Sequence, residues 1–189
     1  MVKLPTYTVK YIADDNGSIR GEATQVVYHG GSTTEVTAVP DEGYRFVSWS
    51  DELTNPKRHE ENVSADAKYT AYFAPRTDIP YTVEYYLQNE DFESYTLKEW
   101  FTLTGTTGTE VYAEEKYYPG YYVNYSNENA IASGTIKADG SLVLKLYYNA
   151  YPYDVIYDSN NDTRDIDEDP NNPYIYEEEV TVLPNMFTA

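Results

Sequence analysis

The densest group of potential ligand atoms is an acidic stretch, D-S-N-N-D-T-R-D-I-D-E-D, which begins at Asp158. Asp158, Asn160 and Asp162 occupy positions 1, 3 and 5 of a calcium-loop spacing, where oxygen ligands converge on one ion. Position 6 is Thr163 instead of glycine, and position 12 is Asp169 instead of glutamate. This stretch therefore has two interpretations, a weak Ca²⁺ site and a solvated acidic loop in which Asn and Asp form turns. No other cofactor is expected.

The sequence offers little for nucleophilic or acid–base catalysis. It contains no cysteine, and its two imidazoles, His29 and His59, have no sequence neighbours typical of a catalytic base. It shows no glycine-rich phosphate loop and no Ser-His-Asp order. With 32 acidic residues, carboxylate pairs occur by chance, and sequence spacing does not fix the separation that glycoside hydrolysis requires. We therefore predict that the chain is not an enzyme.

Tyrosine is the most unusual feature of the composition, with 23 residues in a chain of 189. Adjacent tyrosines on a strand point to opposite faces, so one ring of a pair such as Tyr147-Tyr148 is expected to be exposed. An exposed ring can stack on a sugar or anchor a protein partner. Tyr121, Tyr122 and Tyr125 are our first choice for such a contact surface. The alternative is that the tyrosines pair across strands and only stabilise sheets.

Charge and apolar patterning narrow the class of partner. The 13 basic and 32 acidic residues give a formal charge of −19. Such a surface repels phosphate backbones and anionic lipid headgroups. No apolar run approaches the roughly 20 residues that span a bilayer, and the first residues lack the apolar stretch of a secretion signal. We expect no nucleic-acid partner and no membrane insertion, and a protein or glycan remains as the class of partner.

The chain reads as a tandem repeat. Its opening segments are Y-T-V-K-Y at 7–11, Y-T-V-E-Y at 81–85 and Y-D-V-I-Y at 153–157. A Gly-Tyr pair follows in the first two repeats, at Gly43 and Gly120. This spacing predicts a module at 1–76, a second at 77–150, and the first half of a truncated third at 151–189. A half-module leaves strand edges uncovered, so we expect the last segment to pack on the second module or on a neighbouring copy, a route to self-association.

The local patterns are those of β-strands, and a mainly β fold, α+β at most, is predicted. Alternating apolar residues predict buried strand faces, above all Leu142, Leu144, Leu146 and Tyr148. Asp139-Gly140, between two strand-like segments, predicts a tight hairpin. The third repeat is expected to contain strands at 153–157 and 179–183. Helix is conceivable only at 51–62 and 110–116, which show no sustained period of 3.6.

Residues 34–51, T-E-V-T-A-V-P-D-E-G-Y-R-F-V-S-W-S-D, with the closing Y-T-A-Y-F, resemble the divergent branch of the internalin-type B-repeat. The motif positions are Ala38, Pro40, Gly43, Tyr44, Phe46, Trp49, Ser50 and Asp51. The second repeat is similar to mucin-binding-like repeats, and the third to the first half of a Listeria-Bacteroides repeat. The resemblance implies small β-grasp-like modules in an elongated arrangement, with no catalytic residues to carry over. Independently of the family, Gly43, Tyr44, Phe46 and Trp49 are expected to form the structural core motif, since aromatics supply most burial in so small a domain.

The function predicted from these observations is a non-catalytic, extracellular repeat segment of a bacterial cell-surface protein, acting as a spacer, stalk or adhesive module. Two alternatives stay open, a carbohydrate- or mucin-binding module and an accessory region of a secreted enzyme. Loss of glycan binding on changing Tyr121 and Tyr122 would favour the first alternative. A hydrolase domain elsewhere in the parent protein would favour the second.

Overall fold

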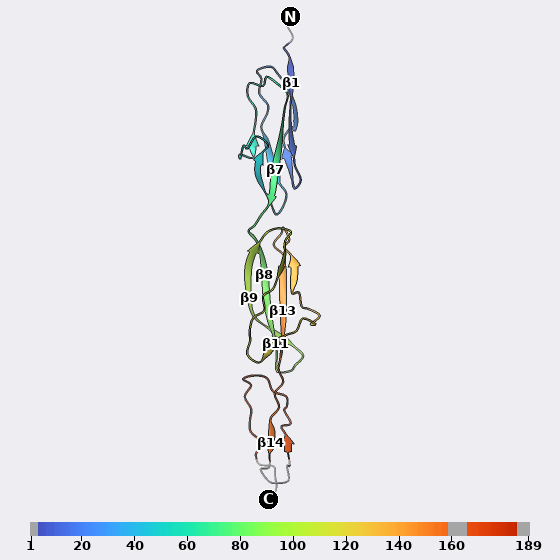
Figure 1. Cartoon of the computed structure of the whole chain (residues 1–189), viewed down its shortest axis with the longest axis vertical. Coiled ribbons are helices and arrows are strands. Elements are labelled where there is room, and N and C mark those ends of the chain that lie inside the picture. Colours follow the sequence, from blue (N-terminus) through green and yellow to red (C-terminus); the bar gives the residue numbers. More distant parts are fainter. Residues whose placement is uncertain (1–3, 159–165, 185–189) are drawn as a thin grey trace. The chain divides into compact units, whose positions relative to one another are not determined.

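The computed structural model describes residues 4–158 and 166–184, and within these ranges every regular element is a β-strand (Figure 1). The mainly β fold class is therefore confirmed. No described segment is a helix long and apolar enough to cross a bilayer. The chain forms two compact units. Unit 1 comprises Met1–Pro80, Thr104–Thr109 and Thr135–Leu142, and unit 2 comprises Tyr81–Leu103, Glu110–Gly134 and Val143–Ala189.

Unit 1 is built on a four-stranded sheet of order β3-β1-β7-β5. Its strands are β1 (Thr6–Ala13), β3 (Thr24–Tyr28), β5 (Tyr44–Trp49) and β7 (Ala67–Pro75). β1 and β7 are central and parallel, whereas β3 and β5 flank them antiparallel. The register of the edge strand β5 shifts between Phe46 and Ser48, as at a β-bulge.

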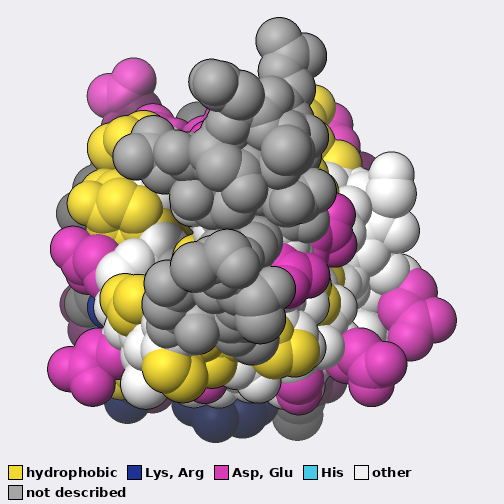
Figure 2. Space-filling view, turned by 90° about the horizontal axis from the view of Figure 1, so that it is seen from below, with side chains coloured by type: hydrophobic (Ala, Val, Ile, Leu, Met, Phe, Trp, Pro, Cys, Tyr) yellow, Lys and Arg dark blue, Asp and Glu magenta, His cyan; other side chains and the backbone are white. Residues whose placement is uncertain are grey.

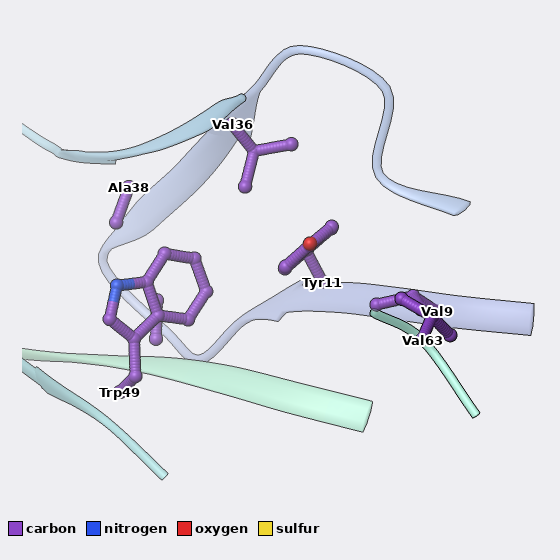
Figure 3. Packing of buried hydrophobic residues seen from close by; sticks show 7 residues of the cluster. Val9, Tyr11, Val36, Ala38, Trp49 and Val63 are labelled. Atoms are coloured by element: carbon purple, nitrogen blue, oxygen red, sulfur yellow. The ribbon is translucent and has the colours of Figure 1, made fainter. Parts of the chain in front are cut away.

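A second sheet completes the core of unit 1. It runs β2-β4-β6, with strands β2 (Gly17–Arg20), β4 (Val36–Pro40) and β6 (Lys57–Arg58). The buried cluster draws on both sheets and consists of Val9, Tyr11, Val36, Ala38, Trp49, Val63 and Ala71. Figure 3 shows the indole of Trp49 beside Ala38 and facing Tyr11. The core thus lies between the two sheets, where alternate residues of β1 and β4 point inward.

Unit 2 repeats the sheet order of unit 1. The strands of this second four-stranded sheet, which lie mainly in unit 2, are β8 (Ile79–Gln88), β9 (Tyr95–Gly105), β11 (Tyr121–Val123) and β13 (Val143–Ala150), in the order β11-β13-β8-β9. β8 and β13 are central and parallel, like β1 and β7. The face predicted from the sequence is confirmed, because Leu142, Leu144, Leu146 and Tyr148 are all buried. A separate pair, β10 (Glu110–Tyr112) with β12 (Ser133–Thr135), accompanies this sheet.

The segment after β13 contains a small antiparallel pair, β14 (Ile156–Asp158) and β15 (Ile166–Glu168). An isolated bridge joins Tyr153 to Tyr174. The strand expected at 153–157 begins only at Ile156. The strand expected at 179–183 is wrong, since the N–H of Leu183 donates to the hydroxyl of Tyr157 (3.1 Å) and no ladder forms.

One other local expectation is wrong. The turn at Asp139-Gly140 forms, with Gly140 N–H donating to the carbonyl of Lys137 (3.0 Å), but the flanking strands do not make a hairpin. β12 pairs with β10, and β13 pairs with β8 and β11, because the apolar face of β13 is used at the centre of a sheet. The stretches 51–62 and 110–116 contain the short strands β6 and β10 instead of helices.

Candidate contact surface

The structure brings Tyr121 and Tyr122 to one hollow in unit 2 and places Tyr125 beside it. Tyr121 and Tyr122 are neighbours on β11, so their rings point to opposite faces of the sheet. Tyr121 is half-buried, and burial raises its pKa. Tyr122 is 42% exposed, with its ring centroid 4.9 Å from that of Tyr151. Tyr125 is exposed, and its hydroxyl donates a hydrogen bond to Glu115.

The hollow is lined mainly by aromatic and charged side chains. Its lining residues are Glu115, Lys116, Tyr117, Tyr118, Tyr121, Tyr122, Val123 and Tyr148. Tyr117 is the most accessible of the tyrosines among them, at 86% exposure. On the face that Figure 2 draws, hydrophobic side chains, a class that includes Tyr, are visible among Asp and Glu side chains.

A partly exposed ion pair involves one of the lining residues, Lys116. Lys116 Nζ is 2.9 Å from Glu99 Oε1 and 3.6 Å from the ring centroid of Phe101. The hydroxyl of Tyr118 donates to the same carboxylate, and its hydrogen bond, with that of Lys116, lowers the pKa of Glu99. Burial and this carboxylate raise the pKa of Tyr118. The pKa of Glu99 is lowered and that of Tyr118 is raised, so both values lie further from 7 than usual. Neither group is therefore suited to exchange a proton near pH 7.

The expectation that one ring of each tyrosine pair is exposed is wrong for Tyr147-Tyr148. Tyr148 points into the core, and Tyr147, on the other face of β13, is only 8% exposed. Its ring stacks on Tyr86, with centroids 4.7 Å apart, and meets Tyr95 edge-on at 5.1 Å. Here the alternative of cross-strand tyrosine packing describes the structure.

The aromatic motif of unit 1 falls on β5 and the turn before it. Trp49 is buried, and its Nε1–H donates to the carbonyl of Asn55 (2.9 Å). Phe46 is partly buried and packs on the cluster, with its ring 5.9 Å from Trp49. Tyr44 is partly exposed, and Gly43 occupies the preceding turn with φ of +78°.

Sequence reasoning missed the most unusual group of this core, Arg58. Its side chain is only 3% exposed, because β6 alternates and turns Lys57 outward and Arg58 inward. The guanidinium carbon lies 4.9 Å from the Trp49 ring and 3.6 Å from the Tyr69 ring. Asp51 accepts two hydrogen bonds from it, and this pairing lowers the pKa of Asp51.

A second carboxylate, Glu60, completes this site at 2.8 Å from Arg58 Nε. The one available signal in the sequence was that Arg58 lies between the acidic pairs Asp51-Glu52 and Glu60-Glu61, which also fits an exposed loop. Both units therefore contain a cation over aromatic rings with a carboxylate partner, Arg58 in unit 1 and Lys116 in unit 2.

Of the predicted calcium ligands, Asn160 and Asp162 lie outside the described residues. Asp158 is the last residue of β14. Asp169 is buried and accepts hydrogen bonds from the Tyr157 hydroxyl (2.6 Å) and the Asn171 N–H (2.9 Å). The hydrogen bond from the Tyr157 hydroxyl is the main cause that lowers the pKa of Asp169. Among residues 4–158 and 166–184, no group of three or more His, Cys, Asp or Glu is arranged to hold a metal ion.

Comparison with known proteins agrees with this architecture. The family model described as "Divergent InlB B-repeat domain" matches residues 7–77, which span the sheets of unit 1 from β1 to β7. The first repeat is thus a divergent InlB B-repeat domain, as its sequence motif indicated. Domains of this kind are typical of repeats in bacterial surface proteins. No curated protein shows significant similarity to the chain.

Proposed function

We propose that the chain is a non-catalytic, extracellular repeat segment that acts as a spacer in a bacterial cell-surface protein. The family match of residues 7–77 supports the class of protein. The recurrence of one sheet order in both units supports the tandem arrangement. A spacer requires independently stable modules and no reactive cleft.

The observation that carries this proposal is that the cations packed on aromatic rings are paired with carboxylates of the same unit. Arg58 is neutralised by Asp51 and Glu60, and Lys116 is bound by Glu99. Breaking a buried pair such as that of Arg58 is costly, so Arg58 acts as a structural element of unit 1. Lys116, whose side chain is 33% exposed, is paired in the same way nearer the surface of unit 2. The acidic formal charge of −19 keeps a repeated surface soluble and repels copies of itself.

Surface display of a reporter domain tests the spacer role. The chain is inserted between a wall anchor and a reporter, and access of a large antibody to the reporter is compared with that of a direct fusion. We expect greater access, and an unrelated β-repeat of equal length should give the same gain. Equal access with and without the chain would contradict the proposal.

Glycan binding at the hollow of unit 2 is a second candidate, favoured by the exposure of Tyr117 and Tyr122 beside Lys116. Exposed aromatic rings next to hydrogen-bonding groups suit the apolar face and hydroxyls of a sugar. Titration of mucin glycans against the whole chain, with Tyr117→Ala and Tyr122→Ala variants, tests it. Tyr28→Ala is the matched control, because Tyr28 is an exposed tyrosine on β3 of unit 1. Binding that survives both hollow variants, or no binding at all, would exclude this candidate.

A further inference from the structure

The two Gly-Tyr turns of the chain have the same geometry. In each, the tyrosine N–H donates to the carbonyl three residues earlier, from Tyr44 to Asp41 (3.0 Å) and from Tyr121 to Tyr118 (3.1 Å). The third residue of each turn is the glycine, with φ of +78° at both Gly43 and Gly120. A turn with positive φ at this position favours glycine.

Each glycine carbonyl also binds the backbone that leaves the last strand of the sheet. Gly43 accepts from the N–H of Arg76 (2.8 Å), directly after β7, and Gly120 accepts from the N–H of Tyr151 (2.8 Å), directly after β13. In unit 1 the hydroxyl of Thr107 adds a further bond to the Gly43 carbonyl (2.8 Å).

A later part of the same compact unit packs directly on each glycine. In unit 1, a Cβ at Gly43 would lie 2.6 Å from the Cβ and 2.9 Å from the Cα of Ala138. In unit 2, a Cβ at Gly120 would overlap Cβ of Tyr176. Real Cβ atoms do not approach other atoms this closely, so a side chain at either position would displace its neighbour.

The two residues that pack on the glycines occupy equivalent places in turns of their own. Ala138 is the second residue of the turn 137–140, closed by Gly140 N–H to Lys137 (3.0 Å). Tyr176 is the second residue of the turn 175–178, closed by Glu178 N–H to the carbonyl of Ile175 (3.2 Å). A glycine packed against the second residue of a turn is therefore found in both units.

We propose that the glycine of each Gly-Tyr turn is a docking seat for a turn that follows later in the chain, and that 175–178 is the counterpart of 137–140. At both seats the docked atom nearest to the added Cβ is itself a Cβ, an atom that Ala138 and Tyr176 share; the next is Cα of Ala138 at Gly43 and Cγ of Tyr176 at Gly120. The seat must therefore be glycine at both positions. This role is additional to the conformational need for glycine and independent of the spacer proposal.

Two other glycines of the chain need glycine for its positive φ but have no docked turn, so they distinguish the two reasons for glycine. Gly30 has φ of +77° and Gly108 has φ of +80°, yet a Cβ at either would meet no atom within 4 Å. Alanine at all four positions carries the same cost of positive φ. Only at Gly43 and Gly120 does it also push away a docked turn.

Amide hydrogen exchange of the whole chain carrying Gly43→Ala or Gly120→Ala, each compared with Gly30→Ala and Gly108→Ala, tests the proposal. We expect exchange at Arg76 in the first variant, and at Tyr151 in the second, to rise about tenfold or more over the controls. Trp49 fluorescence verifies that unit 1 remains folded. Should Gly43→Ala unfold unit 1, the Gly120 variant decides alone. Exchange no faster than in the control variants would overturn the docking seat.

Discussion

The guanidinium carbon of Arg58 lies 3.6 Å from the centroid of the Tyr69 ring, inside the aromatic core of unit 1. Trp49 and Tyr11 lie around the same cation at 4.9 and 5.9 Å. Asp51 and Glu60 provide the compensating charge. A desolvated cation over aromatic rings is attracted by their faces, and its carboxylate partners make the arrangement specific to arginine.

Changing Arg58 to Met is expected to lower the free energy of unfolding by about 3 kcal/mol, because Glu60 would be left without its partner. Urea denaturation followed by tryptophan fluorescence measures this loss. Arg76→Met is the matched control, since Arg76 forms a similar two-bonded pair with Asp78 in an exposed position, and little change is expected there. Equal effects of the two substitutions would show that burial of the Arg58 pair is unimportant.

Trp49→Ala is expected to cost unit 1 about 3 to 5 kcal/mol, since it empties the largest buried side chain of the core. Near-ultraviolet circular dichroism should show loss of unit 1 signals while tyrosine signals of unit 2 persist. Trp100→Ala provides the control, because Trp100 is 59% exposed on β9. A Trp49 variant with the denaturation midpoint of the Trp100 variant would contradict the core role of the motif.

The strand faces could be predicted because burial follows a period of two along central strands. Leu144 and Leu146 share one face of β13 with Tyr148, so alternation alone places them in a core. The position of Arg58 could not be predicted in this way. β6 has two residues, too few for a period, and the compensating Asp51 reaches Arg58 through space.

The tyrosine pairs also show what strand alternation alone does not predict. Alternation correctly separates the directions of Tyr147 and Tyr148, but it does not tell whether the outer face is covered. Tyr86 and Tyr95 cover Tyr147, and this depends on which strands are neighbours. The predicted hairpin at Asp139-Gly140 was wrong for a related reason. The residues of a turn determine the turn itself, but they do not determine which strands pair on either side of it.

Gly17→Ala is expected to destabilise unit 1 by about 1 to 3 kcal/mol, as overpacking does. A Cβ at Gly17, the first residue of β2, would overlap the ring of Phe73. That ring is packed edge-on against Phe46 with centroids 6.0 Å apart, so it has little room to yield. Thermal denaturation of the variant, compared with Ser18→Ala at the neighbouring exposed position, measures the effect.

Adding Phe73→Leu should recover part of the stability lost in Gly17→Ala, because a smaller side chain leaves space for the new methyl group. The double-mutant cycle then gives a favourable coupling between the two positions. Strictly additive losses would mean that the two residues do not compete for the same space.

The buried tyrosines predict that the chain loses stability at alkaline pH. Burial is the leading cause that raises the pKa of Tyr11, Tyr85 and Tyr148 above the ordinary value of 10.0. Burial and the nearby Glu84 raise the pKa of Tyr86 to about 12. The folded state therefore prefers the protonated phenol. Its contribution to stability is complete below pH 10.0 and declines as the pH rises through the raised pKa values, up to about 12 for Tyr86.

Urea midpoints measured between pH 8 and about 11 should accordingly fall in the upper part of that range. Tyrosinate absorbance from the buried rings should appear together with loss of the strand signal in far-ultraviolet circular dichroism. Tyr86→Phe removes the hydroxyl that donates to Glu84 at 2.8 Å, and it should weaken the dependence of the midpoint on pH. Complete ionisation of the tyrosines before any loss of strand signal would show that burial does not protect them. In that case the aromatic cores would not be the origin of alkaline unfolding.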